Sequence, residues 1–227
     1  MSAVRHAVVT DIHGGTARLR AVLERIQEQG VDRVVCLGDV LECRVGKKEA
    51  TGYEFGGRLA DVFDPDPGLA RLLDGALLVR GNQEERIRSL VPGPELPDWT
   101  RPLLDAPLEH RTGFALYCHG HPLPWHELEP GTWCPADADF PGRALVHGHH
   151  HRSALYRLRS VGGGPARAER VPFRFGEPVP LAADGRFVVN VGSVAHCAPD
   201  RGPSPAWAVV DEAAATVTFH HAEEETM

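Results

Sequence analysis

The sequence has no long hydrophobic run. No apolar stretch in its 227 residues approaches the ~18 residues that a membrane-spanning helix needs. The start, MSAVRHAVVTDIH, becomes polar too soon for a secretory signal peptide and is typical of a first strand. We therefore expect no membrane association and no leader segment.

Cysteine is scarce, and its copies are scattered. The number of cysteines is odd, which argues against a disulfide framework, and the absence of C-x-x-C argues against a structural zinc cluster. We expect a reducing, cytoplasmic setting in which the cysteines act as small buried hydrophobic residues. They are Cys36, Cys43, Cys118, Cys134 and Cys197.

Basic residues are in deficit. The chain has 24 Lys and Arg against 31 Asp and Glu, a formal net charge of −7. Proteins that bind duplex nucleic acid usually present a basic face, so this balance disfavours that class. A small phosphorylated substrate, including a nucleotide, remains compatible, because a local site can be positive within an acidic protein. The composition leaves the oligomeric state open.

The first half of the chain alternates strand-like and helix-like segments. A β-branched run at 6–12 is followed by residues 16–29, whose apolar side chains share one helical face. Residues 31–39 are a second apolar run, ending in Gly-Asp, so the three segments predict a βαβ unit and a partly parallel sheet. A third strand at 76–82 and a helix at 83–90 are expected next.

The second half is mostly strand-like. It contains FALYCHG, RALVHGH, SALYRLRS, RFVVNVGS, AWAVVD and ATVTFHH, with little helix between them. An α/β half followed by a β-rich half predicts two packed sheets. Residues 42–75 and 91–107 are irregular and predict loops with short helices, while 161–182 predict a hairpin or excursion. The tail AEEETM is expected to be solvated.

Side chains that bind hard or borderline metals follow five of these strand-like runs. In α/β folds, loops at strand ends converge on sites. One such ending is usually structural, but five in one chain are hard to assign to chance. The residues are Asp11 and His13, then Asp39, Asn82 and His119, and the histidines of VHGHHHR at 146–152.

The order of these pieces resembles that of the calcineurin-like metallophosphoesterases. The pieces are DIH at 11–13, GD at 38–39, GNQE at 81–84, HG at 119–120 and GHHH at 148–151. NVGSV at 190–194 also resembles a late Gly-Ser segment common in bacterial branches of the family. Each piece alone is a weak signal, but the full ordered set is specific.

The resemblance implies a fold and a metal centre. The fold is an α/β class, a four-layer α/β/β/α sandwich of two mixed sheets flanked by helices, in one domain over residues 1–227. The centre holds two divalent ions, with manganese expected and iron or zinc also suited to such ligands. The implied ligands are Asp11, His13 and His151 for one ion, Asn82, His119 and His149 for the other, and Asp39 as the bridge.

The resemblance also implies a reaction, with one departure. A hydroxide bridging the two ions would hydrolyse a phosphate ester, and Asn82 would both bind metal and contact the phosphate. Many members carry histidine after Gly-Asn, where it protonates the leaving group, but here the residue is Gln83. An amide cannot transfer a proton at neutral pH. We therefore favour a phosphodiester substrate, with His121 as a candidate proton donor.

Other residues near these pieces favour structural roles. His147 and His150 are expected to pack or face solvent, and Gly192-Ser193 to form a tight turn supporting the site, since G-x-S-x-G is absent. Some basic and aromatic residues could touch a phosphate or stack on a base, although surface or packing roles are commoner for such residues. These are Arg44, Lys47, Lys48, Trp125 and Trp133.

Two alternatives remain open. One is a phosphomonoesterase acting on nucleotides or phosphoproteins, although GDVLECR lacks the Gly-Asp-x-x-Asp-Arg pattern of protein phosphatases. The other is a binding module that has lost catalysis, although such proteins usually lose several ligands and here all seven positions are occupied. A histidine-rich storage loop would leave Asp11, Asp39 and Asn82 unexplained.

Replacing the bridging carboxylate tests this interpretation. We predict that Asp39→Asn loses most of the phosphoesterase activity, because an amide holds the two ions poorly. Steady-state turnover of Mn²⁺-loaded wild type and variant measures the loss. Turnover near that of wild type would count against a bridging role.

Overall fold

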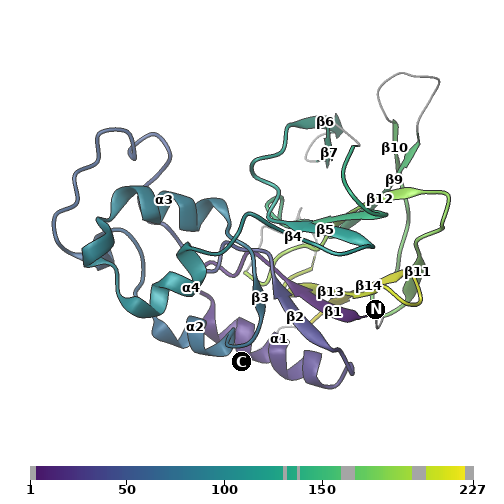
Figure 1. Cartoon of the computed structure of the whole chain (residues 1–227), viewed down its shortest axis with the longest axis horizontal. Helices are drawn as coiled ribbons and strands as arrows, with labels where there is room; N and C mark the ends of the chain where they lie inside the picture. Colours follow the sequence, from purple (N-terminus) through teal and green to yellow (C-terminus); the bar gives the residue numbers. More distant parts are fainter. Residues whose placement is uncertain (1–3, 130–131, 137–138, 160–166, 196–202, 223–227) are drawn as a thin grey trace.

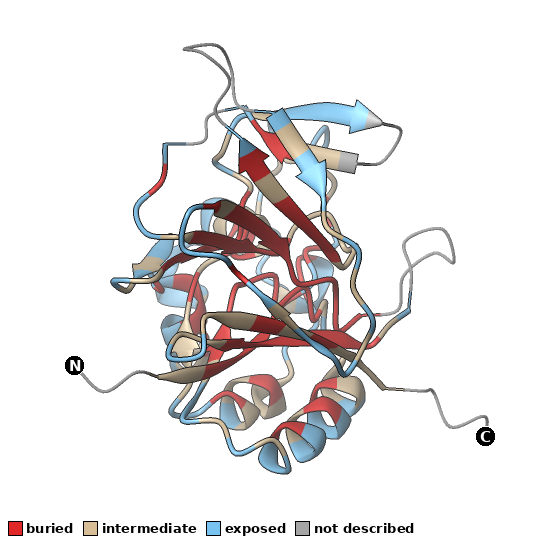
Figure 2. Cartoon of the chain, turned by 90° about the vertical axis from the view of Figure 1, so that its right-hand side faces the viewer, coloured by how far each residue is buried: buried red, intermediate tan, exposed pale blue. Residues whose placement is uncertain are grey.

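The computed structural model describes residues 4–129, 132–136, 139–159, 167–195 and 203–222. They form two six-stranded sheets packed face to face (Figures 1 and 2). The predicted sandwich of two mixed sheets flanked by helices is confirmed. Cys197 and residues 223–227 of the predicted solvated tail lie outside the described residues.

The first sheet contains the predicted βαβ unit. Its order is β11-β14-β13-β1-β2-β3, in which β1, β2 and β3 are parallel and the other pairings antiparallel. The third strand is much shorter than predicted from 76–82. The strands are β1 Arg5–Val9, β2 Arg33–Cys36, β3 Leu77–Leu78, β11 Pro178–Pro180, β13 Ala206–Asp211 and β14 Thr216–His221.

The second sheet has the order β10-β9-β12-β8-β5-β4. Its central strands β12, β8 and β5 are parallel, and antiparallel strands complete both sides. The strands are β4 Glu109–Arg111, β5 Ala115–Cys118, β8 Ala144–His147, β9 Ala154–Arg159, β10 Arg167–Arg170 and β12 Arg186–Asn190.

The helices pack on the outer face of the first sheet, where their apolar faces and those of β1, β2 and β13 share one core (Figure 1). A hairpin, β6 Trp125–Glu129 and β7 Thr132–Pro135, lies over the second sheet. The helices are α1 Thr16–Gln27, α2 Pro67–Leu72, α3 Asn82–Leu90 and α4 Arg101–Leu104, with 3-10 turns at Leu59–Asp61, Gly93–Glu95 and Asp98–Thr100.

Strand β1 shows why the central runs are so apolar. Ala7 and Val9 face the helices, whereas Val8 faces the second sheet, and all three are fully buried. A strand covered on both faces needs apolar residues at every position rather than at alternate ones. Figure 2 shows much of the length of the strands in both sheets coloured as buried. The rigid frame that results fixes where each strand ends.

The segment 161–182, predicted to form a hairpin or excursion, contributes strands to both sheets. Residues 160–166 lie outside the described part. The remainder gives an edge strand to each sheet, because β10 pairs with β9 and β11 pairs with β14. These strands are short and poor in apolar alternation, so the sequence pattern did not reveal them.

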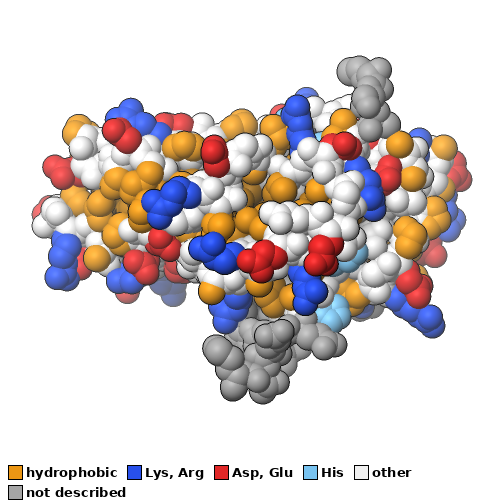
Figure 3. Space-filling model, turned by 90° about the horizontal axis from the view of Figure 1, so that it is seen from below, with side chains coloured by type: hydrophobic (Ala, Val, Ile, Leu, Met, Phe, Trp, Pro, Cys, Tyr) orange, Lys and Arg blue, Asp and Glu red, His pale blue; other side chains and the backbone are white. Residues whose placement is uncertain are grey.

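No helix among the described residues is long and apolar enough to cross a membrane. The face seen in Figure 3 carries acidic and basic side chains interspersed with hydrophobic ones. The four cysteines in the described ranges are buried free thiols, as expected.

Candidate metal centre

The seven predicted ligands lie at one end of the sandwich, after the carboxyl ends of strands. Because β1, β2 and β3 are parallel, as are β5 and β8, the loops that follow them meet at one end of each sheet. Asp11 and His13 follow β1, Asp39 follows β2, Asn82 begins α3 after β3, His119 follows β5, and His149 and His151 follow β8.

The buried carboxylate of Glu84 joins the loop of Asp39 to the start of α3. Its oxygens accept four backbone N–H bonds of 2.8–3.0 Å. Burial and the negative charge of Asp39 raise the pKa of Glu84 to about 7, an effect that the backbone donors partly offset. The donors are Asp39, Val40, Leu41 and Gly81. Glu84 therefore holds two ligand-bearing loops together.

Asp11 has one oxygen tied to the protein and one that is not. Oδ2 accepts bonds from Thr10 Oγ1 at 2.8 Å and from the backbone N–H of His149 at 2.9 Å. Gly148 permits this approach, because a Cβ there would lie 2.1 Å from Thr10 Oγ1 and 2.4 Å from Asp11 Oδ2. Oδ1 is buried without a hydrogen-bond partner in the described ranges. Such an atom is costly to bury unless something positive binds it.

His13 and His151 face this unpartnered oxygen. The two Nε2 atoms lie 3.2 Å apart, and that of His151 lies 3.1 Å from Asp11 Oδ1. Nδ1 of His13 contacts the carboxylate of Glu42, which can only accept, so Nδ1 carries a proton. Once His13 has lost its second proton, its Nε2 therefore offers a lone pair toward the cluster.

His119 presents its Nε2 in the same way. The ring is fully buried, and Nδ1 donates to the carbonyl oxygen of Leu37 at 3.0 Å. Nε2 then lies 3.1 Å from Asn82 Oδ1 and 3.3 Å from Asp39 Oδ2. The other oxygen of Asp39 accepts the backbone N–H of Gln83 at 2.8 Å. In the neutral form of the ring, Nε2 offers a lone pair toward the same cluster.

His149 completes this side of the cluster. Its ring centroid lies 5.1 Å from that of His119. Burial, together with the nearby positive charge of His119, lowers the pKa of His149 to about 4. The ring is therefore neutral at neutral pH, the form that binds metals.

This donor set fits two cations. Two overlapping groups, each with ligand atoms within 4.8 Å of one another, could hold an ion. Oδ2 of Asp39 lies between them, 3.9 Å from His13 Nε2 and 3.3 Å from His119 Nε2, where a bridging ligand is needed. The groups are Asp11, His13 and His151, and Asp11, Asp39 and His119. Carboxylate, imidazole and amide ligands suit manganese, iron or zinc.

The backbone of the cluster is unusual. Five of the predicted ligands adopt left-handed φ values of 47–69°, which non-glycine residues rarely do and which cost about 1–3 kcal/mol each. They are Asp11, His13, Asp39, His149 and His151. The first loop is held by Ser193, whose Oγ donates to the carbonyl of Asp11 at 2.9 Å. The late Gly-Ser segment thus supports the site, as expected.

Gln83 and His121 lie beside the cluster. Oε1 of Gln83 accepts the backbone N–H of Cys43 at 3.2 Å, so this side chain is bonded to the loop after β2. Nε2 of His121 lies 2.9 Å from Glu85 Oε2, and its ring centroid lies 5.4 Å from that of His119. The catalytic roles of both residues remain predictions.

The other two histidines of the run pack against the β6–β7 hairpin. The Trp125 ring lies 4.6 Å from His147 and 4.5 Å from His150, and Trp133 stacks on His150 at 5.9 Å. Nε1 of Trp125 donates to the carbonyl of Gly120 at 2.8 Å, which anchors the hairpin next to His119. Packing is therefore the role that the structure gives these rings.

The basic residues of the loop after β2 are exposed. Arg44 donates to the carbonyl of Ala60 at 2.8 Å, and the side chains of Lys47 and Lys48 are exposed to solvent. Contact between these side chains and a substrate phosphate remains a prediction.

Three glutamates and a threonine were not singled out from the sequence. Glu84 belongs to GNQE and accepts the backbone N–H of Gly81, the residue that caps α3, which is one half of a capping box and a signal that could have been used. Glu42, Glu85 and Thr10 act through contacts that only the fold creates. No sequence spacing indicates such contacts.

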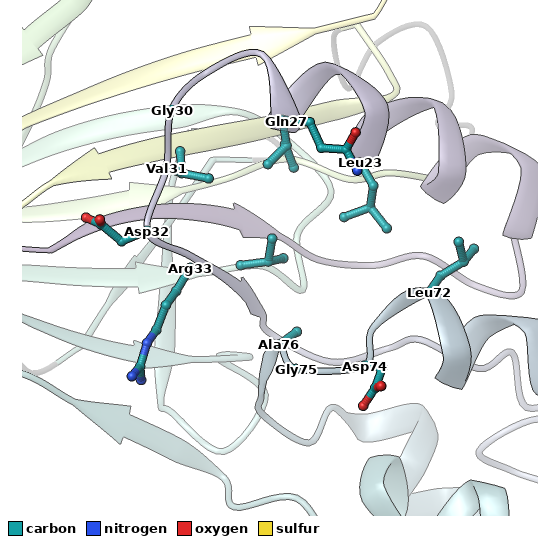
Figure 4. Close-up of a pocket in the computed structure, with 12 residues that line it drawn as sticks. Leu23, Gln27, Gly30, Val31, Asp32, Arg33, Leu72, Asp74, Gly75 and Ala76 are labelled. Carbon is teal, nitrogen blue, oxygen red and sulfur yellow. The ribbon is translucent and has the colours of Figure 1, made fainter.

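A separate cavity of about 510 Å³ lies at the opposite ends of β2 and β3 (Figure 4). Its lining comes from the end of α1, the residues leading into β2 and the turn before β3. Leu23, Val31 and Leu72 give it an apolar wall, and Asp32 and Asp74 lie at its sides. It contains none of the seven predicted ligands.

Comparisons with known proteins concern the family and the fold of the chain. The model of the calcineurin-like phosphoesterase superfamily domain matches residues 4–213. No individual curated protein matches the sequence. Among solved structures, a metallophosphoesterase from Sphaerobacter thermophilus is 20% identical, with 96% of this chain and 88% of that chain covered and a TM-score of 0.63. YfcE, a phosphoesterase from E. coli, is 21% identical, with 91% and 88% covered and a TM-score of 0.48.

Glu84→Gln tests the junction between the two ligand loops. An amide leaves two of the four backbone N–H groups facing an NH₂, so we predict a loss of at least about 2 kcal/mol in the free energy of unfolding. Urea unfolding of the metal-free protein measures it. The matched change at exposed Glu24 of α1 should alter stability by less than about 0.5 kcal/mol. Equal stabilities of the two variants would contradict the role of Glu84.

Metal binding should release protons. Burial lowers the pKa of His13, but the carboxylates of Asp11 and Glu42 outweigh it and raise the pKa to about 10. Burial also lowers the pKa of His119, but Asp11 and Asp39 outweigh it and raise that pKa. Because His13 is protonated at neutral pH, a bound ion must displace its proton, and affinity should rise with pH from 6.5 upward.

Calorimetric titration with Mn²⁺ in buffers of different ionisation enthalpy counts the released protons. We expect about one or two per chain at pH 7.5. Binding heats independent of the buffer, with an affinity independent of pH, would contradict the prediction.

Proposed function

Because the chain belongs to the calcineurin-like phosphoesterase superfamily, we propose that it hydrolyses a phosphate ester with two divalent ions held by its seven-residue cluster. The observation that carries this proposal is the set of histidine nitrogens gathered around Oδ1 of buried Asp11, an oxygen with no hydrogen-bond partner among the described residues. A buried carboxylate oxygen needs positive charge nearby, which cations would supply.

The residues divide between two ion positions. Asp11, His13 and His151 hold one ion, and Asn82, His119 and His149 hold the other, with Asp39 between them. Manganese is the expected metal, and iron or zinc would suit the same ligands. When bound, two such ions neutralise the phosphate oxygens and activate a water molecule for in-line attack.

Asn82 is placed to hold the substrate as well as an ion. It is the first residue of α3, and its Oδ1 is 3.1 Å from His119 Nε2, so the amide group points into the cluster. The N–H groups of an amide can donate to a phosphate oxygen. Asn82 thus orients the phosphate against the ions.

His121 is the proposed proton donor to the leaving group. Gln83 cannot transfer a proton, and its oxygen is bonded to Cys43. Glu85 holds Nε2 of His121 beside the ligands His119 and His149. Burial lowers the pKa of His121, and the hydrogen bond to Glu85 opposes that shift. A lowered pKa makes the protonated, donating form of His121 scarce at neutral pH. A scarce proton donor is adequate for diesters with good leaving groups, which is why a phosphodiester is the favoured substrate.

A comparison of two model substrates tests this proposal. We predict that the Mn²⁺-loaded protein cleaves bis-nitrophenyl phosphate with a higher kcat/KM than nitrophenyl phosphate. The metal-free protein should cleave neither, which serves as the control for contaminating phosphatases.

Other results would favour the alternatives. A strong preference for the monoester would indicate a phosphomonoesterase acting on nucleotides or phosphoproteins. Absence of bound metal in protein purified without chelator, together with no hydrolysis after Mn²⁺ addition, would indicate a binding module that has lost catalysis.

A further inference from the structure

The two ion positions differ in what holds their histidines. Nδ1 of His119 bonds to a neutral backbone carbonyl, that of Leu37, at 3.0 Å. Nδ1 of His13 bonds to a carboxylate, that of Glu42. Nothing in the spacing of the sequence motifs indicates this difference, because Glu42 meets His13 only in the folded chain.

We propose that Glu42 is a positioning residue that makes the two ion positions unequal, so that the ion held by Asp11, His13 and His151 binds first and more tightly. The proposal rests on the two-ion function above. A carboxylate behind a ligating histidine fixes the ring orientation and makes the ring a stronger ligand, and loss of such a partner typically weakens metal binding 10–100-fold.

The backbone around Glu42 is held in place before any ion arrives. The N–H groups of Val40 and Leu41 bond to Glu84, and that of Cys43 bonds to Gln83. Cys43 also pairs with Phe63 in an isolated β-bridge. Glu42 therefore projects from a fixed loop, and Gln83 gains a role in holding that loop.

The charge of Glu42 acts on the nearer ion. Its side chain is 48% exposed, so its negative charge is partly screened by water and costs little to maintain. The same charge also favours a proton on His13, which competes with the ion for the ring. A divalent ion gains about twice the Coulomb attraction that a proton gains from one carboxylate. Competition by the proton therefore reduces the tighter binding of the ion at His13 without reversing it.

Glu42→Gln is the direct test, because glutamine keeps the shape and an acceptor oxygen but removes the charge. Mn²⁺ is titrated into metal-free protein at pH 8, with free Mn²⁺ followed by electron paramagnetic resonance and heats by calorimetry. We expect two unequal dissociation constants for wild type. In the variant the tighter one should weaken 10–100-fold while the weaker one stays within about threefold.

A matched control and a folding check complete the test. Glu54→Gln alters an exposed glutamate of the same irregular segment and should leave both constants unchanged. The Tm of the metal-free protein should be the same for wild type, Glu42→Gln and Glu54→Gln. Equal Tm values would show that weaker metal binding in Glu42→Gln comes from a weaker ligand and not from a damaged fold.

The outcomes separate the two proposals. Two ions bound with the same constants in wild type and Glu42→Gln would overturn the role of Glu42 and leave the two-ion function standing. Equal weakening of both constants would also overturn it, because the effect would not belong to one position. Absence of Mn²⁺ binding in wild type would overturn both proposals.

Discussion

Two carboxylates buried at the end of a rigid sandwich impose the constraint on which the site depends. Asp11 and Asp39 are almost inaccessible to water. Each has one oxygen bonded to protein donors and the other turned toward imidazole nitrogens. Charges buried in this way need compensation. Imidazoles supply it with protons in the metal-free chain, and cations would supply it in the working protein.

The frame that brings these groups together is built mostly from backbone hydrogen bonds. Glu84 holds the loop of Asp39 to the start of α3, and Ser193 holds the loop of Asp11. Five of the candidate ligands have a left-handed backbone conformation, which is unfavourable in free energy. This conformation lets side chains from adjacent loops point toward one place. Because the two sheets fix the strand ends, this cost is met before any ion binds.

Much of the fold, and the meeting of the candidate ligands at one end of it, could be predicted from the sequence. The βαβ unit and the central strands have strong apolar patterns, and Asp11, His13, Asp39, Asn82 and His119 each follow one of them. Strands β10 and β11 have weak patterns and were missed. Glu42 and Glu85 were missed for another reason. Each contacts a histidine that is far away in the sequence, His13 and His121 respectively, and only the packing of the sheets brings the two side chains together.

Diffraction from crystals grown with Mn²⁺, with data collected at the manganese absorption edge, tests the central claim most directly. We predict two anomalous peaks about 3.5–4 Å apart, one beside His13 and His151, the other beside His119 and His149, with Asp39 between them. A single peak, or peaks away from these side chains, would contradict the two-ion centre.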